Sequence, residues 1–332
     1  MSMIDKLDVR VPHSAPYTRE FARLYREIAW DDARRSMEGK PMRQRASRYY
    51  QSVVDLRDFG YDAILHSFAK LSKNGDHKIE LVQTGNMGFS HMVNELSGIF
   101  DVDAQKLVVM RVDLTADVPN IPVAWFLTHC RAQYKRWSAD IGRIVESLEY
   151  SQMGMKEVQT FYLGKRPNVY RIYNKIAEYE YQYKQLLRRA NHDAEIPPFD
   201  EIYGCSSNSI LTRVERQLAS GRVPPQIDTI KKLRSARSFN PFERLKFFAG
   251  CERDPQPFHY RSDVYERGMT VHQEILEQGL QRTRYRLNEQ SRGNADRILK
   301  TLADFIPADG HRITSEELFA RYQESVERQL RA

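Results

Sequence analysis

The sequence predicts an α+β protein in which helices pack against an antiparallel sheet, followed by a small α-helical C-terminal domain. Several short runs alternate apolar and polar residues, as half-buried antiparallel strands do. From about residue 240 the apolar residues instead recur at helical spacing, and a Thr314-x-x-Glu317 capping box opens the last helix. We therefore expect one domain over residues 1–240 and a helical domain over residues 241–332.

The N-terminal part predicts a strand and then a helix. Ile4 to Val11 alternates apolar and polar residues, and Pro12 stops it. Thr18 is placed to cap a helix over Arg19 to Trp30. The polar and basic stretch from Asp31 to Arg48 is predicted to be a loop, either a solvated connection or an arm that faces DNA.

Three more strands are expected in the next part of the chain. Two of them, Tyr61 to Phe68 and His77 to Gln83, are joined by a polar Asn-Gly-Asp turn. Ser90 is predicted to cap the helix that follows. Leu107 to Val118 is the most β-rich run, and it begins with four apolar residues, as a central strand does.

The remaining elements of the first domain surround one basic hairpin. A helix is expected over Val123 to Tyr134 and a covered loop or extension over Lys135 to Lys156. Gln159 to Glu178 contains two β-like segments that flank a basic turn, and a polar helix follows. Ile210 to Leu218 is the last predicted strand.

Charge and composition narrow the class of partner. The 332-residue chain carries 51 lysines and arginines against 44 aspartates and glutamates, a formal net charge of +7. This excess favours a polyanion, either nucleic acid or an anionic membrane surface. No run approaches the roughly 20 apolar residues of a spanning helix, and the N-terminus lacks a signal-peptide pattern. We expect a cytoplasmic protein with no membrane partner. Three scattered cysteines predict neither a disulfide framework nor a zinc site.

The basic hairpin contains the candidate catalytic side chains. In the two-residue period of a strand, Arg171, Tyr173 and Lys175 share one face. A phenol between two cations suits a tyrosine that attacks a phosphodiester, because its ordinary pKa of about 10 must fall first. The alternative interpretation is an edge strand with a solvated basic face.

Two other predicted strands place acids opposite their apolar faces. Asp113 and Asp117 share a face with Arg111, and Glu215 shares one with Arg213. If these strands are neighbours, the acids converge near the tyrosine and offer the hard oxygen ligands that Mg²⁺ or Mn²⁺ prefers. Alternatively, the same residues form cross-strand ion pairs, Asp113 with Arg213. Glu215 would then pair with Arg111.

The run TFYLGKRPNVYRIYNKIAEY resembles the signature of the replication initiation factor family, which comprises rolling-circle initiators of plasmids and phages and related relaxases. There a Tyr-x-Gly-x-Arg turn precedes an Arg-Ile-Tyr-Asp/Asn-Lys strand and a glutamate. The matching residues here are Tyr162, Gly164, Arg166, Arg171, Ile172, Tyr173, Asn174, Lys175 and Glu178. MRVDLTADV and LTRVERQL resemble the family's Arg-x-Asp and Arg-x-Glu strands. The resemblance covers about Ile4 to Phe248, and Lys165 departs from an expected serine.

The resemblance implies a ferredoxin-like antiparallel sheet and a nicking domain over residues 1–240. It implies single-strand cleavage and joining through a covalent 5′-phosphotyrosine, with Tyr173 as the nucleophile and Tyr170 in reserve. Arg171 and Lys175 flank the nucleophile. The implied Mg²⁺ or Mn²⁺ ligands are Asp113, Glu178 and Glu215, with Asp117 as a further candidate.

DNA is the expected partner, as an origin hairpin that is single-stranded at the nick. The candidate DNA-binding residues are Tyr162, Lys165, Arg166, Lys184, Arg188, Arg189 and Arg213. Tyr179, Tyr181 and Tyr183 either stack on unpaired bases or pack within a helix. The sequence does not decide whether the protein also binds a helicase or forms a homodimer. Two other functions compete: a non-catalytic DNA-binding regulator on the same fold, and a hydrolytic metal-dependent nuclease in which the tyrosine is incidental.

Overall fold

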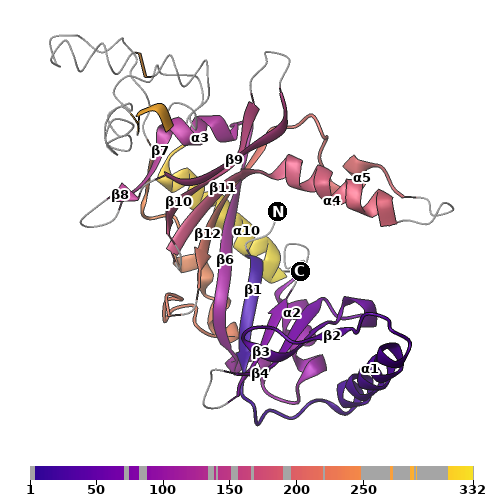
Figure 1. Cartoon of the computed structure of the whole chain (residues 1–332). Helices are drawn as coiled ribbons and strands as arrows, with labels where there is room; N and C mark the ends of the chain where they lie inside the picture. The colour runs from indigo at the N-terminus through magenta and orange to yellow at the C-terminus, as the bar shows by residue number, and fades with distance from the viewer. Residues whose placement is uncertain are drawn as a thin grey trace. The chain divides into compact units, whose positions relative to one another are not determined.

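The structure is a computed structural model of the whole chain (Figure 1). It describes residues 4–70, 75–81, 88–133, 138–139, 141–150, 156–165, 168–189, 196–219, 221–247, 270–271, 285–287, 289 and 313–331. The chain divides into two compact units, each assembled from separate stretches. Unit 1 comprises Met1–Ala116, Arg216–Pro241 and Ala320–Ala332, and unit 2 comprises Asp117–Glu215 and Phe242–Phe319.

Unit 1 is built on an antiparallel sheet with the strand order β2-β3-β4-β5-β1-β6. Its strands are β1 (Ile4–Val11), β2 (Gln44–Arg45), β3 (Tyr50–Asp55), β4 (Ala63–Ala69), β5 (His77–Leu81) and β6 (Val108–Pro119), of which residues 117–119 belong to unit 2. In the central strand β1, Leu7 lies opposite Leu81 on one side and Val112 on the other, and all three side chains are buried. The apolar positions of the alternating run therefore supply the core.

Helices α1 (Arg19–Met37) and α2 (Phe89–Ile99) contribute further core residues to unit 1. Thr18 caps α1, because its hydroxyl accepts a hydrogen bond from the backbone N–H of Phe21. The short helical turns of this unit are η1 (Arg57–Phe59), η3 (Ala104–Lys106), α6 (Ile230–Leu233) and η4 (Ala236–Ser238).

Unit 2 contains strands in the order β12-β11-β10-β9 and a three-stranded sheet in the order β13-β7-β8. The bounds are β7 (Cys130–Gln133), β8 (Ser138–Ala139), β9 (Ile141–Tyr150), β10 (Lys156–Lys165), β11 (Asn168–Asn174), β12 (Leu211–Leu218, with residues 216–218 in unit 1) and β13 (Leu245–Phe247). The helices are α3 (Val123–His129), α4 (Lys175–Arg189) and α5 (Phe199–Tyr203). Figure 1 shows α4 leaving the end of β11, with α5 beside it.

The last helix, α10 (Ser315–Arg331), begins in unit 2 and ends in unit 1. The predicted capping box opens it, since Glu317 Oε2 accepts from the N–H of Thr314 and the Thr314 hydroxyl accepts from the N–H of Glu317. Within unit 1, the Tyr322 hydroxyl donates to the carbonyl of Ala236 at 3.1 Å. This contact holds the C-terminal half of α10 against the segment that follows β12.

The predicted α+β class with a large antiparallel sheet is confirmed. The ferredoxin-like arrangement stays a prediction. Most of the predicted C-terminal domain lies outside the described residues, so the division at residue 240 also stays a prediction. Over the described ranges, no helix is both long and apolar enough to cross a membrane.

The loop predicted from Asp31 to Arg48 is wrong in part. Helix α1 continues to Met37, and β2 follows within the same stretch. Asp31 pairs with Arg34 and Arg35 at helical spacing, which stabilises these polar last turns. Strand β3, which pairs with β4, was not predicted.

Three predictions in the middle of the chain are also corrected. Gly88, not Ser90, occupies the N-cap of α2. The helix predicted over Val123 to Tyr134 ends at His129, and β7 begins at Cys130. The covered loop or extension predicted over Lys135 to Lys156 contains β8 and β9. Strand β7 pairs with β13, so a distant partner overrides the local helical pattern.

Candidate active site

The predicted signature folds as the β10–β11 hairpin of unit 2. In its antiparallel register, Thr160 lies opposite Tyr173 and Tyr162 lies opposite Arg171. Opposite residues share a sheet face, so these four side chains belong to one face of the hairpin. Gly164 has a φ of 90°, which few residues other than glycine adopt readily, and this gives the glycine of the signature a backbone role.

Two cations lie near the ring of Tyr173. The guanidinium carbon of Arg171 is 3.9 Å from the ring centroid, and the ammonium nitrogen of Lys175 is 5.8 Å from it. Lys175 was predicted to share the strand face of Arg171 and Tyr173, but β11 ends at Asn174 and Lys175 is the first residue of α4. Asn174 opens this helix, because its side-chain oxygen accepts from the N–H of Ala177. The phenol is therefore placed between a strand cation and a helix cation.

Arg171 also contacts an acid of the neighbouring strand β12. Its guanidinium is 3.4 Å from the carboxylate of Glu215, whose side chain is completely buried. Burial acts to lower the pKa of Arg171. The phenol of Tyr173 and the two glutamates Glu215 and Glu178 outweigh this effect and raise the pKa above its ordinary value. Arg171 thus stays charged at the centre of the site.

A second, fully buried ion pair joins β6 to β12. Arg213 Nε and Nη2 donate to the two carboxylate oxygens of Asp117 at 2.6 and 2.7 Å. The backbone explains the pairing, because the N–H of Asn120 donates to the carbonyl of Ile210. Asn120 is three residues after Asp117 and Ile210 is three residues before Arg213, so antiparallel strands bring Asp117 and Arg213 opposite each other. The predicted pair of Asp113 with Arg213 is wrong.

The first turn of α4 carries the third ion pair. Lys175 Nζ lies 2.5 Å from Glu178 Oε2 and 4.8 Å from the ring centroid of Tyr179. Tyr179 stacks on Tyr203 of α5 with centroids 4.4 Å apart. Burial raises the pKa of Tyr179 to about 12, against the opposing effect of Arg213.

We call the set of these side chains the tyrosine–ion-pair cluster. Its members are Arg171, Lys175, Arg213, Asp117, Glu178, Glu215, Tyr173 and Tyr179. Three cations balance three carboxylates in it. The cluster can therefore accept the negative charge of a phosphate or a phenolate only if a cation turns away from its own acid.

Access to the cluster is uneven. Tyr173 is 1% exposed and the reserve nucleophile Tyr170 is completely buried. The side chains of Arg171 and Glu178 are exposed by 25% and 27%, whereas that of Lys175 is exposed by 6%. A polyanion that approaches from solvent meets Arg171 first.

Asp113, one of the predicted metal ligands, belongs to unit 1 rather than to this cluster. It is buried, and Arg111 of the same strand donates to both of its carboxylate oxygens, at 2.9 and 2.5 Å. Burial raises the pKa of this carboxyl despite the arginine. The sequence placed Arg111 and Asp113 on one face, and the structure makes them partners.

The described residues do not form a ready metal site. Carboxylate oxygens are the ligand type that Mg²⁺ and Mn²⁺ prefer. Yet each predicted ligand already contacts a basic side chain, and across the described ranges no three His, Cys, Asp or Glu side chains gather to hold a metal ion. No chemical step at these side chains is therefore assigned to a metal ion.

The predicted DNA-binding residues differ in how they are placed. Lys184 and Arg188 are exposed on α4, and Tyr162 is half-buried. Arg213 is buried against Asp117. Arg166 and the side chains of Lys165 and Arg189 lie outside the described residues.

The three tyrosines of α4 separate into two kinds. Tyr179 and Tyr183 pack on α5, the latter also donating to the carbonyl of Pro197 at 3.2 Å. Tyr181 is 65% exposed and is the one that can stack on a base. Sequence reasoning missed Tyr203, because its link to Tyr179 is a tertiary contact.

A comparison with models of protein families finds no match to this sequence, and a comparison with curated proteins finds none either. The resemblance to the replication initiation factor family therefore stays a prediction that rests on the residues quoted above.

Proposed function

We propose that this protein cuts and rejoins one strand of DNA through Tyr173. The phenolic oxygen attacks a backbone phosphorus, the bond from phosphorus to the 3′ oxygen breaks, and a covalent 5′-phosphotyrosine forms. The phenol loses its proton and the departing 3′ oxygen gains one, so no water is consumed. The reverse reaction rejoins the strand. The proposed substrate is an origin hairpin that is single-stranded at the nick.

The proposal rests on one observation, the position of Arg171 and Lys175 around the ring of Tyr173. Cations at this range favour a phenolate, and they also stabilise the charge that develops on the attacked phosphate. Arg171 has the larger role, because it is the more exposed of the two and can exchange Glu215 for a phosphate oxygen.

The burial of Tyr173 adds a requirement to this proposal. Because the side chain is 1% exposed, the phosphorus reaches its oxygen only after neighbouring side chains move. DNA binding itself causes these side chains to move. A phosphate that draws Arg171 away from Glu215 uncovers the ring on the side that Arg171 now covers.

A second candidate function is a DNA-binding regulator that does not cut. The same burial of Tyr173 favours it, together with the pairing of every carboxylate of the cluster to a cation. Such a protein would bind its origin and leave the strand intact.

One experiment separates these functions. The wild-type protein is incubated with supercoiled DNA that carries its own upstream region, in Mg²⁺, Mn²⁺ or EDTA, and covalent adducts are detected on a denaturing gel. Tyr173→Phe is compared with Tyr170→Phe, which removes a hydroxyl from the adjacent buried tyrosine. We expect an adduct with the wild type and Tyr170→Phe, and none with Tyr173→Phe.

The other outcomes are equally informative. Nicked DNA without an adduct would identify a hydrolytic nuclease and overturn the assignment of Tyr173. Origin binding with neither nick nor adduct, in every metal condition, would identify the regulator.

A further inference from the structure

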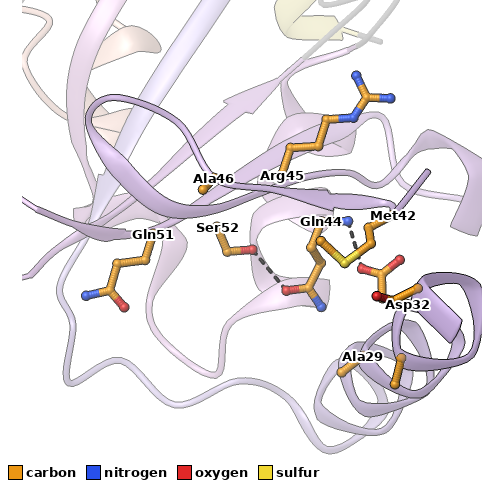
Figure 2. Close-up of a pocket in the computed structure, with 10 residues that line it drawn as sticks. Ala29, Asp32, Met42, Gln44, Arg45, Ala46, Gln51 and Ser52 are labelled. Carbon is orange, nitrogen blue, oxygen red and sulfur yellow. Dashed lines mark hydrogen bonds between the residues drawn. The ribbon is translucent and has the colours of Figure 1, made fainter. Parts of the chain in front are cut away.

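A groove runs along unit 1 between α1 and the β2–β3 hairpin (Figure 2). Its volume is about 490 Å³, within the range of small-ligand sites. The helix lines it with the small side chains Ala29, Ala33 and Ser36, and the hairpin lines it with Gln44, Gln51 and Ser52. The helix side of the groove is therefore lined by small side chains, and the hairpin side is rich in amide and hydroxyl groups.

Part-buried hydrogen bonds hold the two walls of the groove. Asp32 of α1 is buried, and its carboxylate accepts from the N–H groups of Arg43 and Gln44 at 2.5 and 2.8 Å. Ser52 donates to the side-chain oxygen of Gln44 at 3.1 Å, a bond visible in Figure 2. In the described part of the chain, the amide of Gln51 makes no hydrogen bond, so it is available to a ligand.

Large exposed side chains lie close in sequence to the residues that line this groove. Trp30 and Met37 lie three residues before and four residues after Ala33, on the same side of α1, and are 79% and 85% exposed. Tyr49, directly before β3, is 53% exposed, and the guanidinium carbon of Arg48 is 5.5 Å from its ring centroid. A flat ring that contacts no other ring among the described residues is a stacking platform.

The stretch that runs from the end of α1 into the hairpin carries unbalanced positive charge. Residues 31–49 contain six cations and three acids, which leaves a net charge of +3. Asp31 binds three of the arginines, and Glu38 binds Lys40. Arg45 and Arg48 have no carboxylate partner within the described ranges, and Figure 2 shows the Arg45 side chain extending away from α1. These two cations are free to meet an anion.

We propose that this groove binds single-stranded DNA, with a base stacked on Trp30, a neighbouring base edge against Gln44 and Gln51, and phosphates on Arg45 and Arg48. Exposed rings beside cations recognise unpaired bases, whereas a duplex hides the faces of its bases. The charge excess and the polar lining favour this occupant over an apolar peptide. The inference rests on the proposed function, because the strand it would hold is the one that Tyr173 cuts.

The test measures binding without cleavage. Full-length protein in EDTA is titrated into a fluorescein-labelled thymidine oligonucleotide, and into a duplex of the same length, with anisotropy as the readout. Trp30→Ala should weaken oligonucleotide binding about tenfold or more, as for the loss of a stacked base. The double variant Arg45→Ala/Arg48→Ala should also reduce the salt dependence by about 0.7 for each lost phosphate contact.

Lys106→Ala is the matched control, since Lys106 is a highly exposed cation of unit 1 that does not line the groove. It should bind as the wild type does. Equal affinities of Trp30→Ala and wild type, or equal affinities of the wild type for single strand and duplex, would overturn the proposal. Binding is measured in EDTA and the covalent adduct is measured separately, so failure of the groove and failure of the nicking reaction give different results.

Discussion

Arg213 holds the carboxylate of Asp117 through two hydrogen bonds of 2.6 and 2.7 Å, although the two residues are 96 positions apart. Both side chains are buried, so the charge of each is neutralised by the other. Removal of one partner would leave an unpaired charge in a medium of low dielectric constant.

We therefore expect Asp117→Asn or Arg213→Met to lower the free energy of unfolding by about 3–5 kcal/mol, measured by urea denaturation. The double variant Asp117→Leu/Arg213→Met should lose less than the sum of the two single changes. Asp228→Asn, which breaks an exposed pair with Lys232, is the control and should cost less than about 1 kcal/mol. Equal costs for the buried and the exposed pair would contradict this assignment.

Arg171 is expected to act on the reaction through the charge that it places over Tyr173. Arg171→Gln removes the cation over the ring of Tyr173 and should slow adduct formation by about 100-fold or more. Lys184→Gln on the exposed side of α4 is the matched control and should leave the rate of adduct formation within a fewfold of wild type. An Arg171→Gln protein that forms the adduct at the wild-type rate would show that the phosphate charge is stabilised elsewhere.

His77 of unit 1 should make the folded protein less stable at acidic pH. Burial, followed by the charge of His13, lowers the pKa of His77 from 6.5 to about 4, against the smaller effect of Asp76. The unfolded chain therefore binds this proton before the folded protein does, and stability is lost as pH falls from 6.5 towards 4.

The thermal midpoint measured across this range should show the loss, and His77→Phe should reduce it, because a phenyl ring keeps the packing against Phe68 and Phe100. His91→Gln changes an exposed histidine and serves as the control. If the thermal midpoint falls equally with pH in His77→Phe and wild type, other groups cause the loss of stability in acid.

Tyr179 should make the folded protein less stable at alkaline pH. Its pKa is raised from 10 to about 12 in the folded protein, mainly by burial. The unfolded chain then loses the proton first, so this contribution is complete below pH 10 and is lost as pH rises towards 12. Tyr179→Phe should flatten the alkaline limb of an unfolding profile, while Tyr181→Phe, on an exposed ring, should not. A steeper limb in Tyr179→Phe would mean that the sign of the shift is wrong.

Local sequence signals predicted much of this fold. Thr18 and Thr314 each satisfy backbone N–H groups a few residues away, so their helix starts could be located from the sequence. The β10–β11 hairpin was predictable for the same reason, since its alternation and the glycine at its turn are features of one short segment. The helix that continues from Trp30 to Met37 was not, because its polar last turns are stabilised by ion pairs with Asp31.

The candidate site was predictable only as a set of residue types. The sequence by itself determined that a tyrosine flanked by cations lies on a hairpin and that acids lie on the same faces of two other strands, because alternation has a fixed period of two. Only the tertiary structure decided that Arg213 binds Asp117, that Glu215 lies against Arg171, and that Tyr173 is buried beneath Arg171. The physical reason is that the register between strands far apart in the chain depends on packing and backbone pairing over the whole unit, which no local pattern records.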